Sequence, residues 1–144
     1  MKSQPVSILV ADDDEEDRQL IKEALQESRL LNPLEFANDG EELLHRLQSK
    51  KELPGLILLD LNMPKKDGRE ALREIKSNPD FKRIPVIILT TSKAEEDIYR
   101  TYNLGVNSFI TKPVTFTALV DVLNKVAQYW FEIVELPPAK SERT

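Results

Sequence analysis

The sequence contains no cysteine and only one histidine, His45, and both scarcities narrow the chemistry open to its 144 residues. Without cysteine, disulfide bonds and thiolate metal sites are excluded. A bound metal ion would need oxygen ligands, because one imidazole cannot build a histidine site. His45 lies off the apolar stripe of its own segment, so we expect a surface side chain rather than a phosphohistidine or a metal ligand.

The chain also lacks long apolar runs and an excess of positive charge. No run approaches the roughly 18 residues that a membrane helix needs. Only Met1–Pro5 precede the first strand-like stretch, too few for a signal peptide, so we expect a cytoplasmic protein. The formal net charge is −5, and no basic stripe interleaved with aromatic residues is present. Direct binding to DNA or RNA is therefore disfavoured.

Short segments rich in valine, isoleucine and leucine predict five strands. They are Val6–Ala11, Leu34–Ala37, Leu56–Leu59, Val86–Leu89 and Val106–Ile110. The third and fourth show no polar alternation, as expected for strands of a parallel sheet that are buried on both faces. Helices should therefore cover both faces of the sheet.

The segments after these strands carry apolar residues at helical spacing, which predicts one helix after each strand. Gly105 stands where the fourth helix needs a left-handed residue at its end. Five repeats of strand and helix predict a parallel α/β sheet with right-handed crossovers. We place a single domain at residues 1–136 and expect a flexible tail at 137–144, which begins with two prolines.

Acidic residues follow two of the predicted strands. Asp12 and Asp13 follow the first strand, and Asp60 follows the third. In an open α/β sheet, ligands bind beyond the carboxyl ends of the strands. Carboxylates that meet there repel one another unless a cation neutralises them. If the two strands are neighbours, Mg²⁺ fits best, because it binds a few carboxylates and keeps water positions for an incoming phosphoryl group.

A hydroxyl and an ammonium group follow the last two strands. Thr90 comes at the end of the fourth strand and Lys112 after the fifth. A carboxylate nucleophile, a metal ion, a hydroxyl donor and a lysine are together the parts needed to accept a phosphoryl group. The combination predicts that Asp60 forms an aspartyl phosphate.

In order and spacing, these motifs resemble the receiver domains of two-component response regulators, from about residue 6 to 131. The resemblance rests on Asp12-Asp13, the segment Asp60-Leu61-Asn62-Met63-Pro64-Lys65-Lys66-Asp67-Gly68, Thr90, and Phe109-Ile110-Thr111-Lys112-Pro113. A chemotaxis member of this family already illustrates the rule for ligand position. The resemblance implies a flavodoxin-like (βα)5 fold, a doubly wound parallel five-stranded sheet in the order 2-1-3-4-5.

The resemblance also implies roles for the acidic residues. Asp60 matches the phosphoacceptor, and it also belongs to the metal site. Asp13 matches the direct Mg²⁺ ligand, and Asp12 matches the acid that acts through a water molecule. The backbone carbonyl of Asn62 matches a further metal ligand.

Three more residues match the groups that respond to the phosphate. Thr90 and Lys112 match the side chains that bind the phosphoryl oxygens, and Phe109 matches the aromatic residue that turns inward when the threonine swings toward the phosphate. In the family this movement remodels the surface of the fourth helix, fifth strand and fifth helix. The resemblance thus implies a switch that takes its phosphoryl group from a histidine kinase. Such a switch catalyses only its own phosphorylation and dephosphorylation, and it signals by docking or acts as a phosphorelay intermediate.

Two segments are similar to the small regulators that partner cyanobacterial and bacterial phytochrome histidine kinases. They are the segment from Pro64 to Glu70 and the ending from Trp130 to Pro137. This similarity implies a phytochrome-type kinase as phosphodonor and a homodimer through the fourth and fifth helices and the fifth strand. One departure from the family is Thr91, where a smaller residue usually follows the threonine.

A second apolar line on the last helix leaves two interpretations open. It consists of Ala118, Val122, Tyr129 and Ile133. Two-sided apolarity is typical of a partner surface. Alternatively, the segment from Glu132 to Leu136 covers this line within the monomer.

Ordinary structural roles compete with the functional ones. The acids from Asp14 to Asp17 are expected to form a solvated helix start with Asp14 as the N-cap. Thr90 could cap the following helix, and Phe109 could be a core residue. For Lys112, the following Pro113 restricts the backbone and can hold a cis bond that aims the lysine side chain.

Two other functions are weighed against the switch. Phosphatases with an aspartate nucleophile carry a second acid two residues later, where this chain has Asn62. A binding module that works without phosphate has no need of the acids, threonine and lysine that are present here. Both alternatives are therefore disfavoured.

Overall fold

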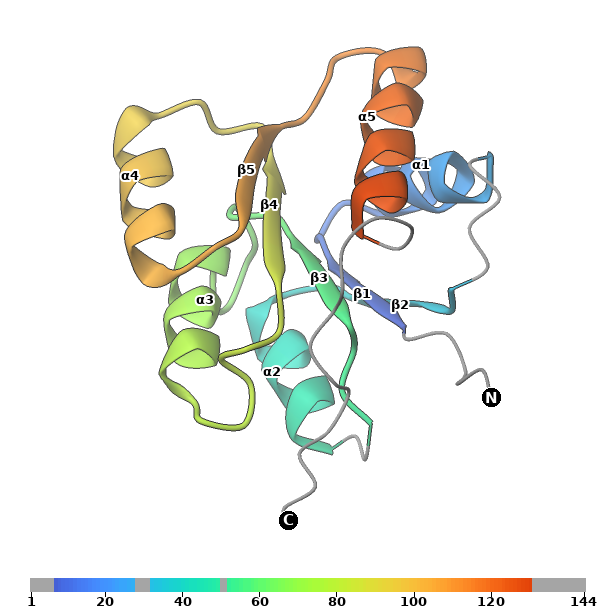
Figure 1. The fold of residues 1–144 in the computed structure, drawn as a ribbon. Helices are drawn as coiled ribbons and strands as arrows, with labels where there is room; N and C mark the ends of the chain where they lie inside the picture. Colours follow the sequence, from blue (N-terminus) through green and yellow to red (C-terminus); the bar gives the residue numbers. More distant parts are fainter. Residues whose placement is uncertain (1–6, 28–31, 50–51, 131–144) are drawn as a thin grey trace.

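A computed structural model describes residues 7–27, 32–49 and 52–130 of the chain (Figure 1). Its elements are β1 (Ile8–Ala11), α1 (Glu15–Glu27), β2 (Leu34–Ala37), α2 (Gly40–Ser49), β3 (Leu56–Leu59), α3 (Gly68–Ser77), β4 (Val86–Thr90), α4 (Glu95–Leu104), β5 (Ser108–Thr111) and α5 (Phe116–Gln128). The predicted alternation of strand and helix is confirmed. Residues 131–136 of the proposed domain and the predicted tail lie outside the described residues. Of the helices described, none has the length and apolarity to cross a membrane.

The strands form one parallel sheet in the order β2-β1-β3-β4-β5, which confirms the order implied by the family resemblance. Strand β1 lies between β2 and β3, with Ile8 in register with both Leu34 and Leu56. The pairing continues past the strand ends, where the Asp60 N–H donates to the Ala11 carbonyl at 2.9 Å. The residues that follow β1 and β3 therefore lie side by side.

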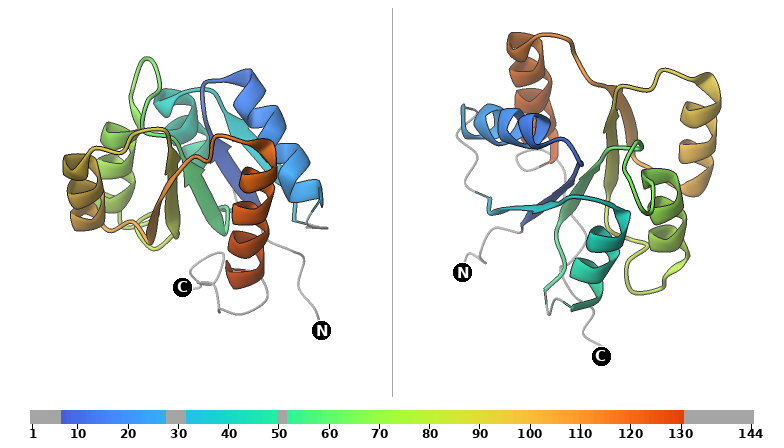
Figure 2. Two further views of the ribbon diagram at one scale, coloured as in Figure 1. Left: turned by 90° about the horizontal axis from the view of Figure 1, so that it is seen from above. Right: turned by 180° about the vertical axis from the view of Figure 1, so that it is seen from behind.

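Helices cover both faces of the sheet. Successive side chains of a strand point to opposite faces, so Ile8 and Val10 pack with α1 and α5, whereas Leu9 and Ala11 pack on the side of α2 and α3. Figures 1 and 2 show α1 beside α5 on one face and α2, α3 and α4 on the other. Strands β3 and β4 are buried at every position, as their unbroken apolar sequences predict.

The fifth strand begins later than the sequence predicts. Val106 is buried, but its N–H donates to the Thr101 carbonyl at 3.1 Å and so completes the end of α4. Gly105 lies between them with a φ of 108°, the left-handed conformation predicted for this position. The helix end therefore occupies the backbone of Val106, and β5 starts at Ser108.

The start of α3 lies against the end of β3. The Gly68 N–H donates to the Leu61 carbonyl at 2.8 Å, and a Cβ atom on Gly68 would lie 2.2 Å from the Asp60 carbonyl oxygen. Asp67 caps the helix by accepting from the N–H groups of Arg69 and Glu70. The Asp67-Gly68 pair thus lets α3 begin in contact with Asp60.

Candidate functional site

Asp60 lies at the end of the central strand β3, and its side chain is tied down by three groups. The Thr90 hydroxyl donates to Asp60 Oδ1 at 2.7 Å, and the Asn62 backbone N–H donates to the same oxygen at 3.2 Å. The Lys112 ammonium donates to Asp60 Oδ2 at 3.3 Å. Because Asp60 is only 7% exposed, these contacts fix the carboxylate in one orientation.

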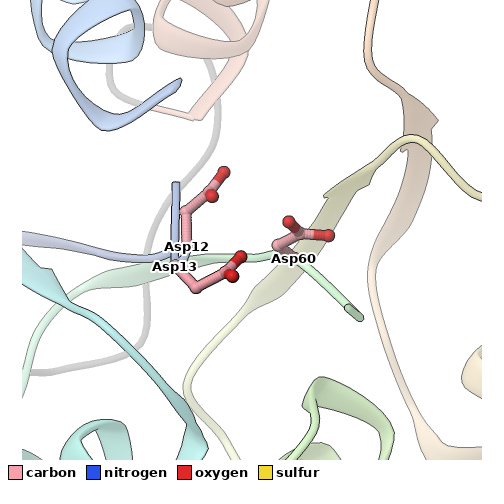
Figure 3. A group of neighbouring side chains, drawn as sticks. All are labelled: Asp12, Asp13 and Asp60. Carbon is pink, nitrogen blue, oxygen red and sulfur yellow. The ribbon is translucent and has the colours of Figure 1, made fainter. Parts of the chain in front are cut away.

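Three carboxylates meet at this edge of the sheet, as predicted. Each of Asp12, Asp13 and Asp60 places an oxygen within 4.8 Å of the others, and Figure 3 shows their side chains extending from the ends of β1 and β3. Asp12 is buried, whereas Asp13 is exposed to solvent. Asn62 follows two residues after Asp60 in the same loop. Oxygen donors that are partly open to water suit a hard divalent cation.

The Lys112 ammonium faces three carboxylates. It donates to Asp12 Oδ2 and to Asp17 Oδ2 at 2.7 Å each, and to Asp60 at the longer distance given above. Burial by itself lowers the pKa of Lys112, but the hydrogen bonds with Asp12 and Asp17 outweigh it and raise that pKa above its usual range. Burial raises the pKa of Asp12, and the hydrogen bond from Lys112 opposes this shift.

The backbone of β5 aims Lys112 at the site. Its N–H donates to the Thr90 carbonyl at 2.7 Å, which extends the pairing of β4 with β5 by one residue. The described residues contain no cis peptide bond, so the cis bond suggested for Pro113 is wrong. Strand pairing, rather than a proline isomer, sets the direction of the lysine.

The prediction of a solvated helix start is correct for Asp14 and wrong for Asp17. Asp14 Oδ1 accepts from the N–H groups of Glu16 at 2.9 Å and Asp17 at 3.4 Å, as an N-cap should. Asp17, in the first turn of α1, instead contacts Lys112. Nothing in the sequence separates it from the neighbouring acids of the helix start, because the contact depends on the path of Lys112 from β5.

The structure places Thr90 in contact with the site, whereas it packs Phe109 against the apolar core. Thr90 is fully buried and its hydroxyl points to Asp60, so it does not cap α4, whose N-cap residue is Ala94. Phe109 is half-buried and packs against the apolar cluster on the α2 and α3 side of the sheet. Its N–H donates to the Tyr102 hydroxyl at 3.2 Å, which connects β5 to α4.

An ion pair that sequence reasoning missed lies beside the site and joins α3 to α4. Arg69 Nε and Nη2 donate to the two carboxylate oxygens of Asp97 at 2.7 Å each, and the Ser92 hydroxyl donates to Asp97 Oδ2 at 2.7 Å. The hydrogen bonds from Arg69, with help from Ser92, lower the pKa of Asp97 to about 2. The pair anchors the segment between β4 and α4.

The remaining sequence candidates lie away from this edge. His45 is exposed on α2, which confirms the prediction of a surface histidine. On α5, Ala118 and Tyr129 are exposed and Val122 is half-buried, so the described part of the second apolar line faces outward. Ile133 and the segment from Glu132 to Leu136 lie outside the described residues.

Comparison with known proteins identifies relatives over nearly the whole chain. The family model for the response regulator receiver domain matches residues 8–124. The response regulator Rcp1 of Synechocystis sp. is 44% identical over 140 residues, which cover 94% of this chain and 95% of Rcp1.

Solved structures agree with this match. The phosphorylated cyanobacterial phytochrome response regulator RcpA superimposes with a TM-score of 0.88 at 40% identity, over 93% of this chain and 99% of RcpA. The Mn²⁺-bound form of Rcp1 superimposes with a TM-score of 0.86 at 43% identity, over 92% of this chain and 99% of Rcp1. Sequence, sheet order and the gathered acids thus lead to one assignment, and the chain belongs to the response regulator receiver domain family.

Proposed function

We propose that Asp60 accepts a phosphoryl group from a histidine kinase and that the protein is a switch controlled by this modification. Receiver domains are the phosphoacceptors of two-component signalling, and this chain belongs to that family. The observation that carries the residue assignment is the Asp60 carboxylate, held by a hydroxyl donor on one oxygen and an ammonium donor on the other.

The proposed reaction follows from these contacts. A carboxylate oxygen of Asp60 attacks phosphorus while the bond from phosphorus to one ring nitrogen of the kinase phosphohistidine breaks. With the other ring nitrogen protonated, the donor leaves as neutral imidazole. The Thr90 hydroxyl and the Lys112 ammonium then bind phosphoryl oxygens. Because both donors already contact the carboxylate, they need little reorganisation to stabilise charge in the transition state.

The same site is proposed to hold Mg²⁺. Asp12, Asp13, Asp60 and the backbone carbonyl of Asn62 would be its protein partners, with Asp12 acting through water. When bound, the ion neutralises negative charge on the carboxylates and on the phosphoryl oxygens. Oxygen donors within 4.8 Å of one another support this assignment, and Mn²⁺ binding by the relative Rcp1 supports a divalent cation.

The proposed output is a change of surface. Thr90 responds to the phosphoryl group, Phe109 follows, and the face of α4, β5 and α5 changes for a partner protein, a second copy of the chain, or the next member of a phosphorelay. Tyr99 and Tyr102 on α4 and Tyr129 at the end of α5 supply exposed aromatic area for such contacts. Under this proposal the protein catalyses only its own phosphorylation and dephosphorylation.

The kinase is proposed to be of the phytochrome type, because RcpA, which is similar over most of the chain, is a phytochrome response regulator. Location in the cytoplasm and a single domain from residue 1 to 136 with a flexible tail at 137–144 remain part of the proposal. Phosphotransfer from candidate kinases, compared side by side, tests the choice of phosphodonor.

The assignment of Asp60 is tested by chemical phosphorylation. Incubation with acetyl phosphate and Mg²⁺ is expected to add one phosphoryl group that hydroxylamine removes, and Asp60→Asn should abolish the addition. Asp39→Asn is a matched control, because Asp39 is also a buried acid that follows a strand, β2. Its side chain accepts from the Glu42 N–H at 2.8 Å, and the amide oxygen of asparagine can accept the same hydrogen bond. Equal labelling of wild type and Asp60→Asn would contradict the proposal.

A further inference from the structure

Asp17 is one of three carboxylates that accept hydrogen bonds from Lys112, and it is not among the site residues implied by the family resemblance. The contact from Lys112 Nζ to Asp17 Oδ2 is 2.7 Å, shorter than the 3.3 Å contact to Asp60 Oδ2. An ammonium group has three N–H donors, and each of them has a carboxylate partner here. A phosphoryl oxygen on Asp60 that binds Lys112 while the Asp60 contact is kept must take the place of Asp12 or Asp17.

Asp12 and Asp17 differ in how readily they can give way. The Asp12 side chain is 2% exposed, and its other oxygen accepts from the Asp14 N–H at 2.9 Å, so it is held deep in the site. The Asp17 side chain is 32% exposed at the start of α1. Water can therefore solvate the Asp17 carboxylate after it leaves Lys112, whereas a buried Asp12 carboxylate without its cation would be strongly destabilised.

The structure also leaves room for this exchange. Asp17, Lys112 and Pro113 border a cavity of about 90 Å³ between the start of α1 and the segment that leads into α5. Movement of the lysine head or of the Asp17 carboxylate therefore needs no rearrangement of the packed core. Glu16, the neighbouring acid on α1, is exposed to solvent.

We propose that Asp17 is a positioning residue that competes with the phosphoryl group for Lys112 and so weakens the phosphorylated state. This inference rests on the proposed phosphorylation of Asp60. In the unphosphorylated protein, Asp17 shares the ammonium with Asp12 and Asp60. In the phosphorylated protein, a phosphoryl oxygen takes the place of Asp17 on the lysine, and the free energy of the lost ion pair is subtracted from the stability of the phosphorylated form.

The test measures the affinity for beryllofluoride, which binds an acceptor carboxylate in place of a phosphoryl group, by calorimetric titration in saturating Mg²⁺. Asp17→Asn should bind it about twofold to fivefold more tightly than wild type, the range of a partly exposed ion pair. Glu16→Gln removes the same charge one residue away and should change the affinity less than twofold. Equal effects of the two substitutions would overturn the proposal.

A second arm separates the lysine from a general effect of charge. In a Lys112→Met background, Asp17→Asn should no longer change the affinity, because the competition needs the ammonium. An undiminished effect there would also overturn the inference, as the gain would then come from lower negative charge alone. Circular dichroism in Mg²⁺ checks that the background is folded, and the comparison of Asp17→Asn with Glu16→Gln stands if it is not. If wild type itself does not bind beryllofluoride, the proposed function fails instead.

Discussion

Two ionic clusters lie near the carboxyl edge of the sheet, and they differ in how their charges are balanced. The lysine cluster consists of Lys112 with Asp12, Asp17 and Asp60, so that one cation serves three carboxylates. Asp13 adds a further negative charge within 4.8 Å of two of them. Most of this cluster is buried, where unbalanced charge is most costly.

The arginine cluster consists of Arg69, Asp97, Ser92 and Asp67. Both oxygens of Asp97 accept from the guanidinium, and the Ser92 hydroxyl donates to one of them, while Arg69 Nη1 also contacts Asp67 Oδ2 at 3.3 Å. A planar fork on a carboxylate is a geometry that lysine cannot reproduce.

The balance of charge in each cluster indicates whether the cluster is suited to bind ligands or to hold helices together. The pair of Arg69 and Asp97 has balanced charges and so has little to gain from a ligand, and it holds α3 against α4. The second carboxylate on Arg69, that of Asp67, is 44% exposed to solvent and caps α3. A buried cluster with excess negative charge gains stability when it binds a cation, and its single ammonium is available to exchange partners. The imbalance of charge therefore supports the proposal that metal and phosphate bind at the lysine cluster.

The largest effect is expected from removal of the lysine. In the presence of a chelator at pH 7, Lys112→Ala should lower the free energy of unfolding by about 3–5 kcal/mol, because it leaves buried carboxylates without a cation. Urea titration measures it. Lys125→Ala is the control, since Lys125 pairs with Asp121 on the surface of α5 and should cost less than about 0.5 kcal/mol. Equal losses of unfolding free energy in the two variants would contradict the expectation that Lys112 stabilises the fold more than a surface lysine does.

Addition of Mg²⁺ should raise the free energy of unfolding of the wild type, and this gain should not depend on the arginine cluster. At a concentration one hundred times the dissociation constant, the gain is about 2.7 kcal/mol. Asp13→Asn should lose most of this gain, while Arg69→Ala should keep it. Thermal unfolding with and without a chelator decides the matter, and a gain that survives in Asp13→Asn would place the metal elsewhere.

Loss of the arginine fork should have a smaller effect, which does not depend on metal. Arg69→Ala is expected to lower the free energy of unfolding by about 1–2 kcal/mol, and Arg69→Lys should recover less than half of it. A double-mutant cycle with Asp97→Ala isolates the pair. A coupling near zero would show that the contact is only a surface ion pair.

The pH dependence of the arginine cluster is the smallest effect expected. The ordinary pKa of the aspartate is 3.8 and the folded value for Asp97 is about 2, so the folded state favours the charged form. The contribution of Asp97 is therefore fully present above about pH 4 and fades as the pH falls toward 2. The difference in unfolding free energy between wild type and Asp97→Asn should shrink over that window, and a constant difference would contradict the assignment.

Much of the fold was predictable because its signals are local. Unbroken apolar segments identified β3 and β4, and Gly105 identified the end of α4. The order of the strands came from the family resemblance, since nothing in the periodicity distinguishes one parallel order from another. The late start of β5 could not be predicted, because Val106 satisfies a strand pattern and a helix end equally well.

The site residues also divide into those that the sequence predicts and those that it does not. Asp12, Asp13 and Asp60 could be predicted because each stands directly after a strand. The bond between Arg69 and Asp97 could not, because these residues are 28 positions apart and only the packing of α3 on α4 brings them together. Asp17 looked like one of several helix-start acids, and only the path of Lys112 distinguishes it.

The most direct test locates the phosphoryl group in the chain. An aspartyl phosphate is reduced by borohydride to homoserine, so phosphorylated protein treated in this way and digested should carry homoserine at position 60 and at no other aspartate. Peptide mass spectrometry measures the substitution, and protein that has not met a phosphodonor is the control. Homoserine at position 12, 13 or 17, with Asp60 intact, would contradict the central claim.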